Sequence, residues 1–178
     1  MSQIKVDSIV PRGGLSGGAS GGIIQMKQTV KQDTFSEVVD RNEETGSCGL
    51  DVTITPSSSS NKMLIFVQAI IGFITDDNVG FVIRRGSTTL SDYLPTGAGS
   101  RTTVGSGGVT RNNAYLANVN GNFLDSPSTT SSITYSVRLK YGRGDDNRTL
   151  YLNRGEDSSD NESRMRSCSV ITVMEVAG

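Results

Sequence analysis

Residues 135–153 read YSVRLKYGRGDDNRTLYLN, and this stretch decides the fold class. Apolar residues occupy every second position of its first half: Tyr135, Val137, Leu139 and Tyr141. Alternation with period two is typical of a β-strand with one buried face. The turn-forming residues 142–147 then lead into a second apolar run at 149–153, and this order predicts a β-hairpin.

Similar patterns on both sides of this stretch predict more strands and no helix. We expect strands at 24–30, 50–54, 63–74, 79–85, 114–124, 135–141, 149–153 and 168–176. The stretch 63–74 is the most apolar, which suits a central strand covered on both faces. Periodicity alone would also fit a buried helix, but its Ile, Val and Phe content and Gly72 favour a strand. The predicted fold class is therefore all-β, an antiparallel β-sandwich of the jelly-roll type with about eight strands.

The first 22 residues differ from the rest of the chain. Ile4, Val6, Ile9 and Val10 alternate with polar residues, Pro11 follows, and a Gly-rich tract extends to Gly22. Such a segment has too few apolar residues to fold alone. We expect residues 1–22 to be an extended anchor on a flexible tether, and residues 23–178 to be the head domain. A disordered tail is the alternative.

The composition of the 178-residue chain excludes several classes of function. Apolar residues make up 34% and the chain has 21 Gly, which suits short strands joined by many turns. Histidine is absent, which excludes Ser-His-Asp hydrolysis and histidine metal sites. The net charge is −1 with both signs interspersed, so we expect no nucleic-acid partner. No apolar run is long enough for membrane insertion, and no cofactor or metal motif is present.

Two polar segments, 86–113 and 154–167, are predicted to be long loops, and long loops are often functional or disordered. The first is the candidate receptor-contact loop, because Tyr and Arg are frequent anchors at interfaces. Its candidate contact residues are Asp92, Tyr93, Arg101 and Arg111. Arg143-Gly144-Asp145 spells an integrin-binding tripeptide, but ordinary turn chemistry explains it better. No arrangement of residues identifies a catalytic centre, so we expect no enzymatic activity.

Several longer motifs resemble a known group of proteins. The opening IKVDSIVPRGG, followed by GASGGIIQMKQTVKQDTFS, resembles the start of small fibre-like structural proteins of marine tailed bacteriophages, of the cyanophage type. Further similar segments are VTITPSSSSNKMLIFV, FVIRRGST, GNFLDSPSTTSSITYSVRLK, LYLNR and SVITVMEVAG. The resemblance implies a virion component whose head is similar to the jelly roll of the tumour-necrosis-factor and complement globular-head type, which forms homotrimers. The chain differs from the proteins that it resembles in having Cys48 and Cys168 and in being short.

The two cysteines leave two alternatives open. The first and last strands of a jelly roll are neighbours, and Cys48 precedes an early strand while Cys168 opens the last, so that the pair is a candidate disulfide. The other alternative is two free buried thiols, which the reducing cytoplasm in which phage proteins assemble favours.

The leading functional hypothesis is a short trimeric fibre or knob, anchored to the capsid or the tail of a virion that assembles in the host cytoplasm. The expected virion-anchor residues are Ile4, Val6, Ile9, Val10 and Pro11. Host adhesion is part of this hypothesis, with a surface glycan or protein as the partner. The alternatives are a passive capsid decoration or cement protein and, more remotely, a glycan-degrading enzyme.

Overall fold

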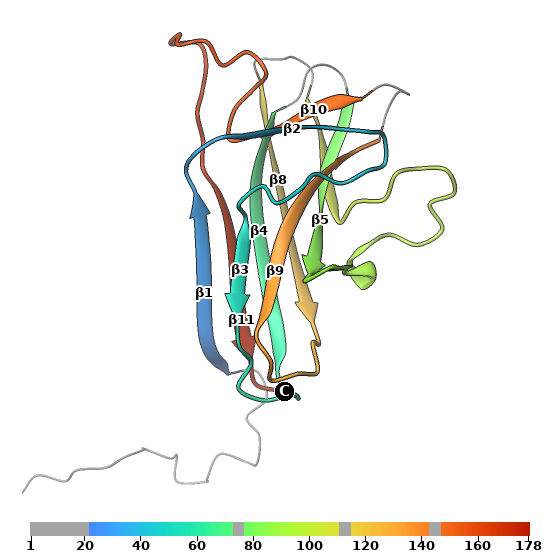
Figure 1. Ribbon diagram of the computed structural model, residues 1–178, viewed down its shortest axis with the longest axis vertical. Coiled ribbons are helices and arrows are strands. Elements are labelled where there is room, and N and C mark those ends of the chain that lie inside the picture. The colour runs from blue at the N-terminus through green and yellow to red at the C-terminus, as the bar shows by residue number, and fades with distance from the viewer. Residues whose placement is uncertain (1–21, 73–76, 111–114, 143–146) are drawn as a thin grey trace, which may run out of the picture.

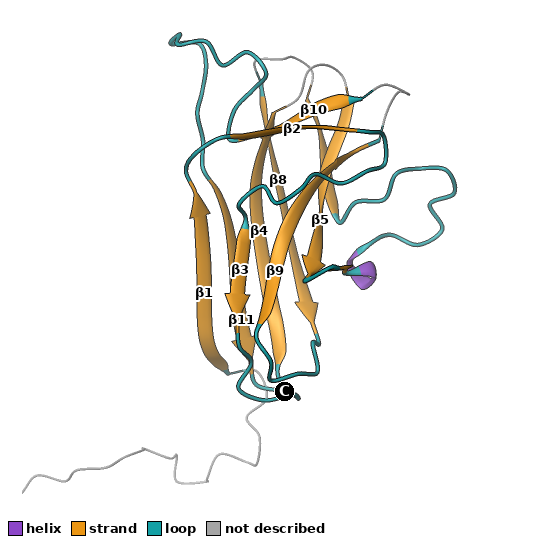
Figure 2. Ribbon diagram, in the orientation of Figure 1, coloured by secondary structure: helices purple, strands orange, loops and turns teal. Residues whose placement is uncertain are grey.

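The structure is a computed structural model that describes residues 22–72, 77–110, 115–142 and 147–178. Nearly all of its regular structure is β-strand, and the exception is one 3₁₀ turn, η1 (Figure 2). The elements are β1 (Ile23–Lys31), β2 (Phe35–Val39), β3 (Asp51–Ile54), β4 (Lys62–Gly72), β5 (Asp77–Arg85), β6 (Thr88–Thr89), η1 (Ser91–Tyr93), β7 (Ser106–Thr110), β8 (Leu116–Asp125), β9 (Ile133–Tyr141), β10 (Arg148–Leu152) and β11 (Ser169–Val176).

These strands form two antiparallel sheets that face each other, which confirms the predicted β-sandwich (Figure 1). The first sheet has the order β1-β11-β4-β10-β2, and β8 also pairs with β4. The second sheet has the order β3-β9-β5-β6, and β7 also pairs with β5. The first and last strands, β1 and β11, are direct neighbours from Ile23–Val176 to Lys31–Ser169. This neighbour relation is the one that a jelly roll requires.

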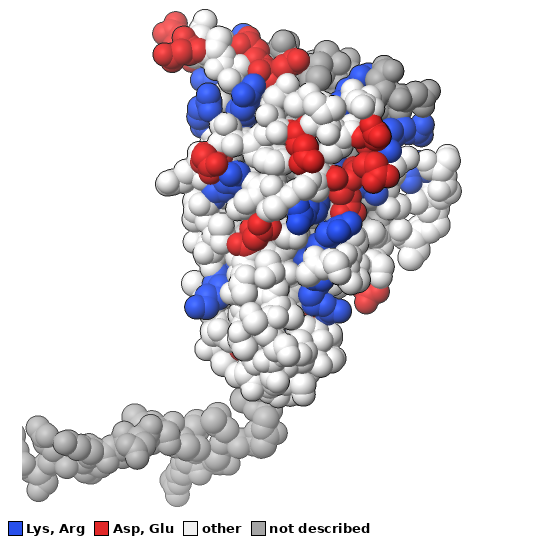
Figure 3. Space-filling view, viewed as in Figure 1, with Lys and Arg blue, Asp and Glu red and all other residues white. Residues whose placement is uncertain are grey.

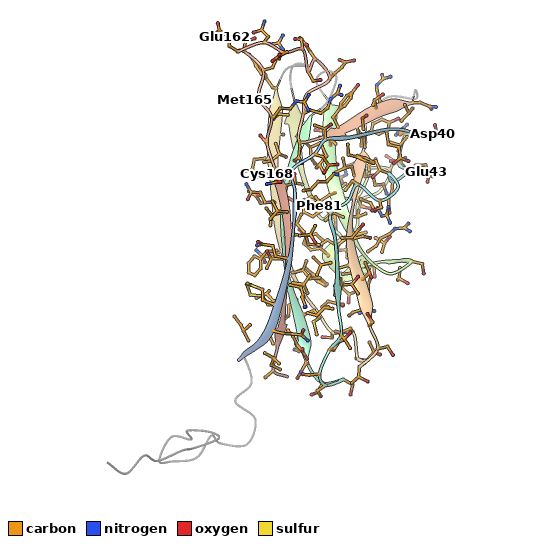
Figure 4. The ribbon with its side chains drawn as sticks, turned by 60° about the vertical axis from the view of Figure 1, so that its left-hand side comes forward. Asp40, Glu43, Phe81, Glu162, Met165 and Cys168 are labelled. Atoms are coloured by element: carbon orange, nitrogen blue, oxygen red, sulfur yellow. The ribbon has the colours of Figure 1, made fainter. Side chains whose placement is uncertain are left out.

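The core lies between the inner faces of the two sheets. Its largest fully buried side chains are Tyr135, Tyr141, Phe81, Leu50, Ile54, Met63, Ile65, Ile71, Ile83, Leu139 and Leu150. Phe81 lies between the two layers (Figure 4). Each such side chain contributes about 1.5–3 kcal/mol through its burial. The low apolar content of the chain is therefore concentrated on the faces where it stabilises the fold.

The predicted hairpin around residues 142–147 is wrong. β9 pairs with β3 and β5 in the second sheet, whereas β10 pairs with β2 and β4 in the first. The segment between them therefore connects the two sheets. Alternation in the sequence indicates which face of a strand is buried, but it does not identify the neighbouring strand.

The segment 86–113 was predicted to be a long loop, and it contains three regular elements. β6, η1 and β7 all lie within it, and β7 pairs with β5 from Phe81–Ser106 to Asp77–Thr110. The sequence of β7, SGGVT, looks like a turn because Gly is rare in strands. β5 and β7 approach closely at Gly80 of β5, where a Cβ atom would lie 2.4 Å from the carbonyl oxygen of Ser106. On β7 itself, a Cβ atom on Gly107 would lie 3.3 Å from the carbonyl oxygen of Val79.

β4 is central, as predicted, but the expectation that both of its faces are covered is only half right. Met63, Ile65 and Val67 point inward and are buried, whereas Phe66 on the outer face keeps 42% of its surface exposed. The outer face of the first sheet is therefore exposed at its centre.

Asn153 joins four parts of the sandwich. It follows β10, is fully buried and has a φ of 63°, in the left-handed region that Asn tolerates better than most residues. Its Nδ2 donates to the carbonyl oxygens of Lys31 (2.8 Å) and Asp33 (2.9 Å), and its Oδ1 accepts from Ser169 Oγ (2.6 Å). The Asn153 amide nitrogen also donates to Ile70 O. One side chain thus fixes the corner between β1 and β2 against the start of β11.

Glu175 is a buried carboxylate that is stabilised without a cation. Its Oε1 accepts from Ser57 N (2.6 Å), Ser57 Oγ (2.7 Å) and Asn61 Nδ2 (2.6 Å), and its Oε2 accepts from Gln25 Nε2 (2.5 Å). Burial acts to raise the pKa of Glu175, but the hydrogen bonds from Asn61, Gln25 and Ser57 together outweigh it and lower the pKa from 4.5 to about 2. The carboxylate holds the 57–61 turn on the last strand.

Acid is therefore expected to weaken the fold through Glu175. Because its pKa is lower in the folded than in the unfolded state, its contribution is fully present above pH 4.5 and is lost as the pH falls toward about 2. Urea unfolding across this pH range should give a free energy of unfolding that becomes smaller as the pH is lowered. Glu175→Gln should have a smaller free energy of unfolding at neutral pH, and that free energy should depend less on pH. The exposed control Glu162→Gln should behave like the parent. An unchanged dependence in Glu175→Gln would refute this assignment.

Candidate functional site

The most distinctive surface of the molecule is the outer face of the first sheet. Residues that alternate with the inward-pointing ones on β1, β11, β4 and β8 form it, and none of them is charged. We call this set the uncharged face: Ile24, Met26, Gln28, Val30, Leu64, Phe66, Gln68, Ile70, Leu116, Asn118, Asn120, Asn122, Leu124, Val170, Thr172, Met174 and Val176. Lys62 lies at its rim, opposite Val176.

The register of the strands places these residues in rows across the sheet. One row is wholly apolar and runs Met26, Met174, Leu64, Leu124. The next row runs Gln28, Thr172, Phe66, Asn122, and Gln28 Nε2 donates to Thr172 Oγ1 at 2.8 Å. Met26 is 57% exposed and Leu124 47% exposed, so the two ends of the apolar row face solvent.

The uncharged face is hollowed in its middle. A depression of about 540 Å³ lies around Phe66 and is bordered by amide and hydroxyl side chains. Its border residues include Gln28, Gln68, Asn120, Asn122, Val170 and Thr172. The depression contains no titratable group, so it offers neither a proton donor nor a general base. What it offers is apolar surface with neutral hydrogen-bonding groups, which is the chemistry of a contact surface.

The opposite side of the sandwich has a different character. Lys and Arg alternate with Asp and Glu over the upper part of the side on which β3 and β9 lie (Figure 3). The outward-pointing residues of that sheet include Asp51, Arg84, Arg138 and Lys140. The contrast matters because a soluble single domain rarely leaves a large contiguous apolar patch in water. An exposed, charge-free sheet face therefore indicates an interaction site.

The anchor and several other sequence candidates fall outside the described residues. They are Ile4, Val6, Ile9, Val10 and Pro11 of the anchor, Arg111 of the candidate receptor-contact loop, and the tripeptide Arg143-Gly144-Asp145. Their roles stay predictions.

The structure places the other candidate contact residues in different surroundings, and their role in receptor contact stays a prediction. Asp92 is exposed in η1, and Arg101 is exposed nine residues later, where its Nε donates to Ala98 O at 2.8 Å. Tyr93 is half-buried: its ring lies 5.4 Å from that of Phe123 and 6.3 Å from that of Phe81, and burial raises the pKa of its hydroxyl. Cβ atoms on Gly105 or Gly121 would overlap this ring. Tyr93 thus anchors its own segment to the core.

Tyr93→Ala should therefore destabilise the fold rather than remove a surface contact. Loss of the ring leaves a space between Phe81, Phe123 and the two glycines, and we expect the free energy of unfolding to fall by about 3 kcal/mol. Urea unfolding measures this change. The matched control is Tyr115→Ala, because Tyr115 is 63% exposed, and it should stay within about 0.5 kcal/mol of the parent. Equal stability of the two variants would contradict the anchoring role.

The cysteines are free, so the candidate disulfide is not formed. Cys48 is buried, its thiol donates to Val137 O at 3.1 Å, and burial raises its pKa to about 11. Cys168 is exposed just before β11 (Figure 4). The sequence expectation of two buried thiols holds for Cys48 alone.

Sequence reasoning missed the uncharged face, although its residues lie in predicted strands. The pattern that reveals it is the outward set of β8, in which three Asn and two Leu occupy every second position and none is charged. Within the described ranges, no cluster of three or more acidic or Cys side chains is placed to bind a metal ion. The same ranges contain no helix that is long and apolar enough to cross a membrane.

Comparison with known proteins gives distant similarities. No protein-family model matches the chain, and no curated protein matches it. Among solved structures, it is similar to a chain of infectious bursal disease virus, Gx strain (10% identity, TM-score 0.43), to one of the Gt strain (10%, 0.40) and to one of T=1 particles derived from this virus (11%, 0.37). The matches cover 98% of this chain and 45%, 44% and 42% of the viral chains, so it spans less than half of their length. Similarity at this level supports no conclusion about function.

Proposed function

We propose that the chain is a structural protein of a virion, a short appendage whose head associates as a homotrimer through the uncharged face. The observation that carries the proposal is this face itself. Four strands about 4.8 Å apart and roughly 30 Å long present on the order of 550 Å² in projection. A stable interface buries roughly 800 Å² of accessible surface per partner, so the available area is of the right order.

The lack of charge on this face favours a second copy of the chain as its partner. In a trimer, different parts of this face on neighbouring copies meet without like-charge repulsion, and no ion loses its hydration when they do. The amide side chains of Gln68, Asn118, Asn120 and Asn122 can both donate and accept, so they can form hydrogen bonds with the amides of a neighbouring copy. The number three is supported by the resemblance to jelly-roll heads that form homotrimers.

The virion role is supported by the resemblance of segments throughout the chain to fibre-like phage proteins. In this role, residues 1–22 anchor each copy to the capsid or the tail, and the head projects from that point. Three copies present every exposed loop three times, which strengthens weak contacts with a host surface. We infer that the role is not enzymatic, because the chain lacks histidine and shows no catalytic motif.

Capsid decoration without host contact is the second candidate function. The position of Tyr93 favours this function. Tyr93 is the strongest candidate anchor of the receptor-contact loop, but its ring packs on Phe81 and Phe123 and is therefore not presented to a receptor.

Light scattering on the full-length protein tests the assembly. A homotrimer has a mass three times 18.9 kDa, and a monomer at all accessible concentrations would refute the proposal. A variant without residues 1–22 should still form a trimer, with the correspondingly lower mass, and should no longer join particles when it is supplied during phage growth. Incorporation of the shortened protein would show that the anchor lies elsewhere.

A further inference from the structure

We infer that the threefold axis of the assembled head runs along β8, where Asn118, Asn120 and Asn122 of the three copies meet their own counterparts. The inference rests on the proposed homotrimer and names the part of the uncharged face that lies at its centre. It is carried by the distribution of amides on this face, by their lack of partners within the chain and by the symmetry of a trimer.

The amides are gathered at one margin of the uncharged face. Asn118, Asn120 and Asn122 occupy successive outward positions on β8, and we call these three residues the amide column. Gln68 lies opposite Asn120 on the neighbouring strand. Among the described strands, β8 pairs only with β4, so the amide column lies at the margin of the face. β1 forms the opposite margin (Figure 1), and its outward residues are apolar except for Gln28.

The amide column has no partner of its own in the single chain. All three side chains are exposed, and none of their amides is hydrogen-bonded to another group of the described ranges. The amide of Gln28, by contrast, already donates to Thr172 Oγ1. When an interface closes over the amide column, its amides lose their water, and an amide left unpaired there is costly. The apolar margin of a neighbouring copy offers no hydrogen bond, so the amide column needs groups that both donate and accept.

The symmetry of a trimer supplies such groups at one place. In a closed ring of three copies, each contact joins two different parts of the surface, so a residue meets its own counterparts only at the threefold axis. Three Asn side chains around this axis form a closed ring, in which each Nδ2 donates to the Oδ1 of the next copy and every Oδ1 has a donor. The uncharged face therefore satisfies its amides best when β8 lies at the axis.

The spacing of the strands extends this arrangement over the whole face. Outward residues of one strand repeat every ~6.7 Å, so the amide column gives three rings stacked along the axis. β1 is three strand spacings from β8, about 14 Å away, and its apolar residues meet a different part of the next copy. Hydrogen bonding thus fixes the centre of the assembly, and apolar contact covers its outer part.

Cysteine cross-linking of the full-length protein tests the position of the axis. Cys168→Ser removes the exposed thiol, while Cys48 stays buried. In this background, Asn120→Cys should place three thiols close together. Incubation with a short bis-maleimide, over the time in which copies exchange, should then join two copies of a trimer covalently. The matched control is Met26→Cys at the apolar margin, whose copies lie far apart and should stay separate on a denaturing gel. Light scattering checks that both variants are trimers.

Asn120→Leu provides a second measurement that needs no reagent. It changes all three copies at once, so it removes one ring completely and leaves no amide unpaired. Its association constant should therefore stay within about fivefold of that of the parent. If Asn120 met a different group of the next copy, that group would lose its partner and association would weaken by about tenfold or more. Trimers that mix parent and variant copies leave amides unpaired, so coexpressed copies should sort into separate trimers.

The outcomes separate this inference from the proposed assembly. The position of the axis is overturned, with the homotrimer intact, if Asn120→Cys copies are not joined, if Met26→Cys copies are joined as readily, or if Asn120→Leu weakens association tenfold. Free mixing of parent and Asn120→Leu copies would also overturn it. A monomeric parent overturns the proposed assembly itself, and light scattering on the parent shows this before any variant is made.

Discussion

If the head forms the proposed homotrimer through the uncharged face, the Leu64→Asp variant is expected to fold normally and to be a monomer. Leu64 lies in the middle of the apolar row, between Met174 on β11 and Leu124 on β8. Its side chain points outward and is half-buried in the single chain, so an aspartate there stays hydrated as long as no copy docks. In the assembly, each copy would bury an unpaired carboxylate, which costs on the order of 3–5 kcal/mol. That cost lowers the association constant by roughly 10²- to 10⁴-fold per interface.

Light scattering over a concentration series measures this effect, and urea unfolding confirms that the variant is folded. The matched control is Thr53→Asp, because Thr53 is also an outward-pointing strand residue but lies on the other sheet, next to Thr134. It should remain trimeric. Persistence of the trimer in Leu64→Asp would exclude the uncharged face as the interface, and dissociation of both variants would indicate a general effect of added negative charge.

Asn153→Ala should cause the largest loss of stability among single substitutions outside the apolar core. The variant leaves the carbonyl oxygens of Lys31 and Asp33 without their buried donor and removes the acceptor of Ser169 Oγ. It also forces alanine into a left-handed backbone conformation, which costs about 1 kcal/mol or more. Together these effects should lower the free energy of unfolding by about 4 kcal/mol, a large share of the roughly 5–15 kcal/mol of a typical domain.

Two further variants separate these contributions. Asn153→Gly removes the backbone strain but not the side-chain loss, so it should be about 1 kcal/mol more stable than Asn153→Ala. Asn153→Asp keeps the size of the side chain and the oxygen that accepts from Ser169 Oγ. Its second carboxylate oxygen cannot donate to the carbonyl oxygens of Lys31 and Asp33, so this variant should also be strongly destabilised. Asn147→Ala, at an exposed position, should stay within about 0.5 kcal/mol of the parent when unfolding is followed in urea. A mild effect in Asn153→Asp would show that shape, rather than hydrogen bonding, matters at this position.

Much of the sandwich was predictable because strands with one buried face carry a period-two pattern. β9 is the clearest case, since Tyr135, Val137, Leu139 and Tyr141 are all buried. The partners of the strands were not predictable, and the wrong hairpin between β9 and β10 is the result. β7 was missed because its Gly-rich sequence is typical of a turn, and only the folded backbone shows its pairing with β5.

The candidate sites were harder to predict than the fold, because they depend on which residues share a surface. From the sequence, Tyr93 is expected to be an exposed interface residue, because it lies in a polar segment. In the structure its ring packs against Phe123. From the sequence, Leu64 and Met174 of the apolar row are expected to lie in the core, because they are apolar residues within strands. Only the register of the strands shows that they point outward.

The pairing of β1 with β11 has a mechanical consequence. If residues 1–22 hold the protein on a particle, a pull on the head is transmitted through Gly22 along the axis of β1. Hydrogen bonds between antiparallel strands lie perpendicular to the strands, so such a pull shears the whole ladder from Gln25–Glu175 to Lys31–Ser169 at once instead of opening it rung by rung. The load is shared by many hydrogen bonds, so the attachment of the head to residues 1–22 should resist a pull along β1 better than a pull across it.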